Sequence, residues 1–140
     1  YVLDKTQEIT KVLDDIHQIL KIPLCGISNI QSGYKPLPSI ESWLFDINSA
    51  NFIVTDSFHG MVFSILFHKP FVVIVNGKRG AERFQNLLSL LSLDERLLTS
   101  IDNLKVILEK NINWEIVDAK LNSLREKSLE FLTNSLASNE

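Results

Sequence analysis

The sequence predicts an α/β domain: a Rossmann-like parallel sheet with flanking helices, followed by a long C-terminal helix. Short apolar segments at residues 1–3, 24–28, 51–55 and 71–75 alternate with segments whose apolar residues have helical spacing. The last of these segments, Phe-Val-Val-Ile-Val, is a continuous apolar run, which is typical of a strand buried on both faces. Strands that alternate with helices favour a parallel sheet with right-handed crossovers.

The first half of the chain is expected to contain two amphipathic helices. Either Asp4 or Thr6 can cap the first helix, which ends before Pro23. Residues 29–38 contain one glycine and two prolines, so we expect a loop there. Ser39 then caps the second helix. The apolar face of that helix is expected to consist of Ile40, Trp43, Leu44 and Ile47.

The second half continues the alternation and then becomes helical. A buried helix after residues 51–55 is expected to stop at Pro70, and a further helix follows the loop at residues 76–80. Its inward residues are expected to be Phe84, Leu87, Leu88 and Leu91. Residues 97–98 fit a short edge strand, and residues 102–110 a modest helix. From Trp114 to Phe131 the apolar spacing predicts a long helix, laid across the domain or against a missing neighbour.

Composition sets the limits on organisation and partners. A chain of 140 residues, 45% of them hydrophobic, fits one domain, with an α/β core at residues 1–100 and C-terminal helices at 101–140. The net charge of −3 argues against nucleic acid, and no apolar stretch is long enough for a membrane span. The lone Cys25 suits the reducing cytoplasm. Because the chain starts in an expected strand and without Met, we expect it to be a piece of a longer protein.

The most informative feature is the sequence Asp-Ser-Phe-His-Gly at residues 56–60, between an expected strand and an expected helix. This is the place where α/β domains bind ligands, since helix amides and the helix dipole favour anions there. His59 can bind an anion or move a proton at neutral pH, although a core or capping histidine is an equal alternative. Gly60 lets a ligand or another backbone come close. Asp56 and Ser57 also fit simple helix caps.

A basic loop supplies the second candidate site. Lys78 and Arg79 follow the expected strand at residues 71–75, and Arg83 shares a helix face with Arg79 if the helix begins near Arg79. Guanidiniums at a helix start oppose the dipole unless an anion sits there, although solvated surface charges are the alternative. His17 is expected to face solvent and His68 to cap a helix. Zinc-ligand spacing, phosphate-loop motifs and a G-x-S-x-G elbow are missing from the sequence.

Motifs in a fixed order resemble the polysaccharide pyruvyl transferase family. They are Ser-Phe-His-Gly at residues 57–60, Lys-Pro-Phe at 69–71 and the basic loop, within a similarity that covers about residues 38–98. The resemblance implies a two-lobed fold like that of GT-B glycosyltransferases, of which this chain resembles the C-terminal lobe. Members commonly carry Arg-Leu-His-Gly at the first motif. His59 and Gly60 match it, whereas Ser57 replaces an arginine that would grip a carboxylate or phosphate bidentately.

The resemblance also implies a function: transfer of a pyruvyl group from phosphoenolpyruvate to a sugar, forming a ketal in bacterial cell-surface polysaccharide or exopolysaccharide biosynthesis. The expected site residues are His59 as catalytic residue, with Ser57, Gly60, Lys78, Arg79 and Arg83 binding substrate or anion. No cofactor or metal is expected. The expected partners are phosphoenolpyruvate, a glycan or lipid-linked sugar acceptor, and the protein's own N-terminal lobe. This chain alone is therefore expected to fold but to be inactive.

Two other functions fit the same residues. One is a GT-B-type glycosyltransferase whose nucleotide-sugar diphosphate meets the same helix start and arginines. The other is a non-catalytic module that binds an anion, or packs against a partner through its last helix.

Overall fold

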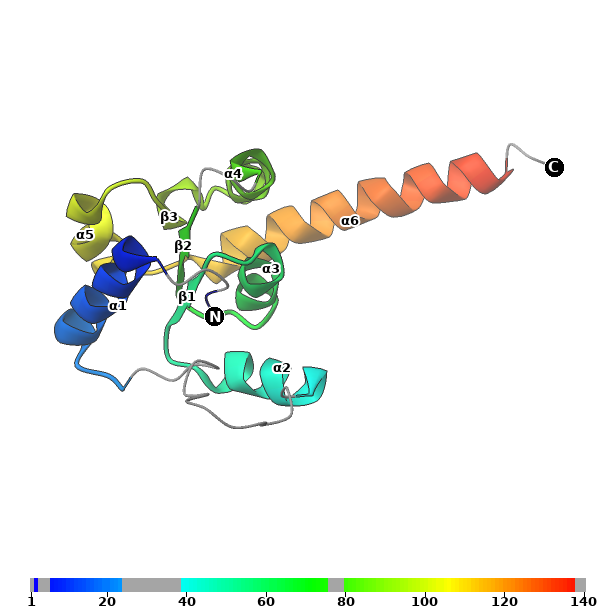
Figure 1. Cartoon of the computed structure of the whole chain (residues 1–140). Coiled ribbons are helices and arrows are strands. Elements are labelled where there is room, and N and C mark those ends of the chain that lie inside the picture. The colour runs from blue at the N-terminus through cyan, green and yellow to red at the C-terminus, as the bar shows by residue number, and fades with distance from the viewer. Residues whose placement is uncertain (1, 3–5, 24–38, 76–79, 138–140) are drawn as a thin grey trace.

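The computed structural model describes residues 2, 6–23, 39–75 and 80–137, and these form a three-stranded parallel sheet with flanking helices (Figure 1). The strands are β1 (Ile53–Thr55), β2 (Phe71–Ile74) and β3 (Leu97–Leu98), in the order β1-β2-β3. Both strand pairs are parallel. The predicted fold class is therefore confirmed, including the short strand at residues 97–98. The strands predicted at residues 1–3 and 24–28 and the loop predicted at 29–38 lie almost wholly outside the described residues.

Helices cover both faces of the sheet (Figure 1). One face carries α1 (Gln7–Leu20) and α5 (Leu104–Glu109). The other carries α2 (Ile40–Ser49), α3 (Phe58–Leu66), α4 (Ala81–Leu90) and the first part of α6 (Trp114–Ala137). Two 3₁₀ turns, η2 (Asp94–Arg96) and η3 (Ile101–Asn103), flank β3.

Alternate residues of each strand enter separate hydrophobic cores, one on each side of the sheet. Val54 and Val72 pack with the buried residues of α1 and α5. Ile53, Phe71 and Val73 pack with α2, α3, α4 and α6 in the larger core. Because both faces are buried, β2 needs apolar residues at every position, which explains its uninterrupted apolar sequence.

Hydroxyl side chains start three of the helices. The Thr6, Ser39 and Ser57 hydroxyls accept hydrogen bonds from backbone amides three residues further on, at 3.2, 3.2 and 3.4 Å. Each therefore satisfies one of the amides that a helix start leaves without an intrahelical partner. The predicted caps at Thr6 and Ser39 and the capping interpretation of Ser57 are confirmed.

One detail of the predicted helices is wrong. Ile40 is 72% exposed rather than inward, because it is the first residue of α2 and lies beyond the packed part of that helix. The helix before Pro70 ends at Leu66 and is followed by the expected turn, in which His68 has a positive φ. Helix α4 begins at Ala81 and Arg79 lies outside the described residues, so a shared helix face of Arg79 and Arg83 stays a prediction.

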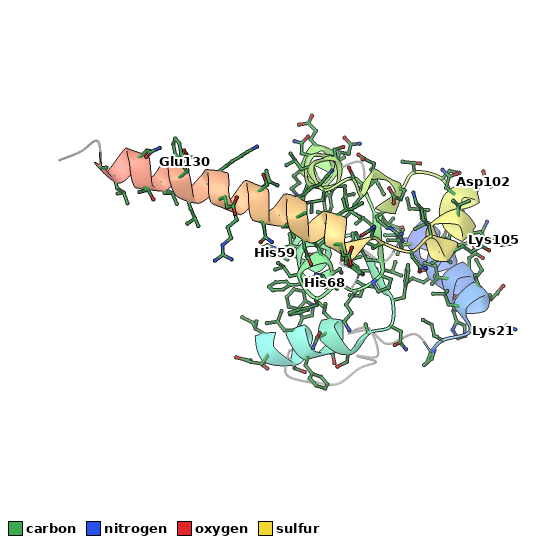
Figure 2. All side chains as sticks on the ribbon, turned by 180° about the vertical axis from the view of Figure 1, so that it is seen from behind. Lys21, His59, His68, Asp102, Lys105 and Glu130 are labelled. Carbon is green, nitrogen blue, oxygen red and sulfur yellow. The ribbon has the colours of Figure 1, made fainter. Side chains whose placement is uncertain are left out.

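Helix α6 has two halves with different surroundings. Val117 is buried in the larger core, and Leu121 and Leu124 are partly buried against it. Beyond Leu124 every described residue is exposed, and Figure 2 shows Glu130 on a stretch of helix that projects away from the other elements. Of the two predicted arrangements, packing along the domain is confirmed for the first half only. Within the described ranges, neither α6 nor any other helix is long and apolar enough to cross a membrane.

Two side chains of α6 hold the turns that end α3 and α4. The Asp118 carboxylate lies 2.9 Å from Nε2 of His68, whose ring also stacks on Trp114 with centroids 4.9 Å apart. The Lys120 ammonium donates to the Ser92 hydroxyl. His68 and Ser92 both have a positive φ, of 52° and 56°, directly after their helices, which confirms that His68 helps to end its helix. These contacts fix α6 against both turns.

Candidate functional site

The sequence at residues 56–60 turns the chain from β1 into α3 at the carboxyl end of the parallel strands. The buried Thr55 hydroxyl accepts a hydrogen bond from the Ser57 amide at 3.0 Å, which tightens this turn. Ser57 then caps the helix, so that Phe58 and His59 occupy its first two positions. The amides of these two residues have no intrahelical acceptor, and they point out of the positive end of the helix dipole. The turn therefore has the local geometry that favours an anion.

Gly60 is required by packing within this turn. A Cβ atom at this position would lie 2.3 Å from Oγ1 of Thr55, far inside the contact distance of real atoms. The sequence suggested that Gly60 allows close approach of a ligand or another backbone, but the group that approaches is the side chain of Thr55. The Gly60 carbonyl is also engaged, because it accepts a hydrogen bond from the Ser64 hydroxyl at 2.7 Å. A role of Gly60 in binding a ligand stays a prediction.

Ser57, like Gly60, has a structural role in the turn and a predicted role in binding a ligand. Its side chain is 7% exposed, and its hydroxyl is already used as the cap of α3. A serine hydroxyl can still donate its proton while it accepts from the Gly60 amide, so contact with an anion is chemically compatible with capping. That contact stays a prediction.

The His59 side chain is exposed at the start of α3, as a ligand-binding or proton-transferring imidazole must be. Its ring meets the Phe58 ring edge to face, with centroids 6.4 Å apart. Among the described residues neither ring nitrogen of His59 has a hydrogen-bond partner. A role of His59 in binding an anion or moving a proton stays a prediction.

Arg83 comes from α4, in the first turn after Gly80. Its Cζ atom lies 5.2 Å from the centroid of the Phe58 ring and 5.3 Å from that of Phe84. Within the described ranges the guanidinium forms no ion pair, so its in-plane N–H groups stay available to an anion. The structure thus brings Arg83 and His59 to the same aromatic ring. Lys78 and Arg79, which the sequence assigned to the same site, lie outside the described residues.

Phe58 connects the two candidate elements and was not recognised from the sequence. Its ring is half-buried, contacts His59 and Arg83, and packs edge to face on Phe84 at 5.6 Å. The only sequence signal was a phenylalanine beside the junction histidine. A phenylalanine in an apolar segment is normally assigned to the core. Its contact with α4 could not be predicted, because that contact depends on tertiary structure.

A second feature that the sequence analysis missed lies at the opposite end of the strands. Arg96 is 1% exposed and donates to the carbonyls of Ile107, at 3.0 Å, and Lys110. Burial lowers the pKa of this guanidinium, which Glu95 partly counteracts. Arg96 also lines a cavity of about 480 Å³ together with Asn51, Phe52, Pro70 and residues of α1, α5 and α6. None of the residues that line this cavity belongs to the predicted site.

The described residues contain no group of three or more His, Cys, Asp or Glu side chains that could hold a metal ion.

Comparison with known families places the chain without testing the roles of the rim residues. A family model described as polysaccharide pyruvyl transferase matches residues 3–78, which is more than half of the chain. The chain belongs to the polysaccharide pyruvyl transferase family. The matched segment contains the whole 56–60 junction and ends before Arg83, so it is shifted toward the N-terminus relative to the resemblance at residues 38–98. The match therefore covers the position of His59 but not that of Arg83, and the roles of both residues stay predictions.

Searches of curated proteins and of solved structures returned no significant match. The described residues agree with one α/β lobe of the kind the pyruvyl transferase resemblance implies, and the two-lobed GT-B-like arrangement stays a prediction.

Proposed function

We propose that the full-length protein transfers a pyruvyl group from phosphoenolpyruvate to two hydroxyls of a sugar in a bacterial cell-surface polysaccharide. The observation that carries this proposal is the arrangement of His59 and Arg83 around one aromatic ring at the start of α3, in a chain of the pyruvyl transferase family. A trianionic donor needs both cationic groups and a proton donor. This rim supplies a guanidinium, an imidazole and a helix start within one neighbourhood.

The proposed reaction forms two C–O bonds and breaks one. The methylene carbon of phosphoenolpyruvate takes up a proton and becomes a methyl group, which makes the adjacent carbon electrophilic. One sugar hydroxyl adds to that carbon, and a second hydroxyl closes the ketal as inorganic phosphate leaves. The two hydroxyl protons are released, so the reaction needs no oxidant, reductant or cofactor.

His59 is the proposed general acid for the methylene carbon, or alternatively the donor that binds the leaving phosphate. Arg83 is the proposed partner of a donor oxyanion, because its in-plane donors match a carboxylate or phosphate in a bidentate way. Arg83 thereby supplies a guanidinium that position 57 lacks, since Ser57 offers a single neutral hydroxyl. We propose that Lys78 and Arg79 bind further oxygens of the same donor.

The acceptor is proposed to be a glycan or lipid-linked sugar held largely by an N-terminal lobe of the full-length protein. We propose a cytoplasmic location for the reaction, which agrees with the single Cys25 and with a donor from central metabolism. This chain alone should therefore bind donor weakly and show no turnover.

The test is acceptor-dependent release of inorganic phosphate from phosphoenolpyruvate by the full-length protein and its His59→Gln variant. Glutamine keeps hydrogen-bonding capacity but cannot act as an acid, so we expect kcat to fall by about 10²- to 10⁴-fold. His17→Gln is the matched control, because His17 is an exposed histidine on α1, far along the chain from the rim, and should leave turnover unchanged.

Two outcomes would contradict the proposal. Unchanged turnover in His59→Gln would remove His59 from the chemistry. Turnover with a nucleotide sugar but not with phosphoenolpyruvate would assign the rim to a glycosyl donor, whose diphosphate can use the same guanidinium and helix start.

A further inference from the structure

The Phe58 ring is the shared contact of the two polar groups at the rim. The guanidinium of Arg83 lies over its face, with Cζ 5.2 Å from the centroid, and the ring of His59 meets it edge to face. Phe58 is itself fixed from below by the buried Phe84, whose ring it meets at a centroid distance of 5.6 Å. The packed rings of Phe58 and Phe84 therefore support the side chains of Arg83 and His59.

An exposed arginine without such support samples many rotamers, so ligand binding must overcome the conformational entropy that the side chain loses. The guanidinium of Arg83 is restrained instead by contacts with two rings, at 5.2 and 5.3 Å. Attraction between a cation and the negative face of an aromatic ring favours this geometry. A cation–π contact uses the positive charge and no hydrogen bond, so it leaves the guanidinium N–H groups to a ligand. The contact is thus of a kind that orders the cation without using its donors.

We propose that Phe58 is a positioning residue: its ring holds Arg83 in the orientation that binds the anionic donor, at a fixed place relative to His59. This inference rests on the proposed function, since it assigns Arg83 to the donor. It adds a residue that neither the family match nor the junction motif identifies as functional, and it predicts that ring chemistry at position 58 controls donor affinity rather than the chemical step.

The experiment compares Phe58→Leu, Phe58→Tyr and Arg83→Met in the full-length protein, with phosphoenolpyruvate as the varied substrate. Leucine keeps an apolar side chain but has no quadrupole, so KM for phosphoenolpyruvate should rise about three- to thirtyfold while kcat changes less than threefold. Tyrosine keeps the ring and should restore the wild-type KM. Phe58→Leu should add little to the KM of Arg83→Met, because both changes disable the same guanidinium.

Phe63→Leu is the matched control. Phe63 lies on the same helix and is also half-buried, but its ring contacts Trp43 and Phe67 and not Arg83. It should lose stability much as Phe58→Leu does, without a change in KM. An equal rise in KM in the two leucine variants would mean that general loosening of α3 explains the effect, and would overturn the proposal.

Other outcomes also separate this inference from the proposed function. If wild type turns over phosphoenolpyruvate but Phe58→Leu lowers kcat with KM unchanged, the inference is wrong and the function stands. If wild type shows no turnover, the function fails. A double-mutant cycle of Phe58→Leu and Arg83→Met on urea unfolding then still measures the contact, and additive effects would show that Phe58 does not hold Arg83.

Discussion

Gly60 illustrates how one absent side-chain atom fixes the start of α3. A Cβ at this position would lie 2.3 Å from Oγ1 of Thr55, and that oxygen cannot swing away freely because it accepts the Ser57 amide. Alanine is normally better than glycine inside a helix by about 0.5–1 kcal/mol. Here we expect the overlap to dominate, so that Gly60→Ala lowers the free energy of unfolding by about 1–3 kcal/mol in urea titrations.

The same change in a Thr55→Ala background isolates that overlap. Without Oγ1, the added Cβ at position 60 no longer meets a fixed atom, so Gly60→Ala should become neutral or stabilising. A cost that is equal in both backgrounds would show that Thr55 is not the obstacle.

At the scale of single residues, the sequence predicted local interactions well and distant ones poorly. The cap at Ser57 depends on a residue three positions away, so the junction sequence was sufficient to indicate it. The same junction did not distinguish an exposed His59 from a core or capping histidine, and the structure shows that its side chain is exposed. The contact of Phe58 with Arg83 spans 25 residues and two helices, and no local pattern encodes which side of α3 faces α4. The two features that the sequence analysis missed, Phe58 at the candidate site and Arg96 at the opposite end of the strands, both depend on contacts of this second kind.

Among the elements, α5 depends on a buried cation from outside the helix. The Arg96 guanidinium donates to the carbonyls of Ile107 and Lys110, near the C-terminal end of α5. These are carbonyls that a helix end leaves unpaired, and the negative end of the helix dipole favours a cation there. Burial lowers the pKa of Arg96, and the carboxylate of Glu95 partly counteracts this effect.

Arg96→Leu should therefore lower the free energy of unfolding by about 2–4 kcal/mol, since it leaves buried acceptors without donors. Lys105→Leu is the matched control, because it removes an exposed cation of α5 whose ion pair with Glu109 is worth less than about 1 kcal/mol. Thermal and urea unfolding of both variants would measure the difference. Equal stability of Arg96→Leu and wild type would contradict a supporting role of Arg96 for α5.

Element types followed from the sequence, whereas the way elements are joined did not. The apolar run of β2 and the helical spacing in α1, α4 and α6 identified those elements. In each case the spacing of the apolar residues shows which residues of the strand or helix are buried. Helix ends were less predictable. Leu66 ends α3 through a turn at His68 whose partner, Asp118, is 50 residues away. A pairing at that separation depends on where α6 lies, which periodicity alone does not reveal.

For the molecule as a whole, one apolar stripe of α6 has two different environments. Val117, Leu121 and Leu124 pack against the larger core. The stripe continues with helical spacing to Phe131 and Leu132, which are 71% and 54% exposed. The sequence predicted the stripe from end to end because spacing reports the helix and its apolar face. It could not predict where the supporting surface ends, since that is set by the size of the sheet and the positions of α3 and α4 (Figure 1).

This difference yields a comparison of two positions on the same stripe. Val117→Ala removes methyl groups from a buried site and should lower the free energy of unfolding of this chain by about 1–3 kcal/mol. Leu132→Ala removes a larger side chain from an exposed site, yet should change that free energy by less than about 0.5 kcal/mol. Urea unfolding of the 140-residue chain measures both. A cost of Leu132→Ala that matches the cost of Val117→Ala would mean that the second half of α6 is buried in solution, which contradicts the arrangement described here.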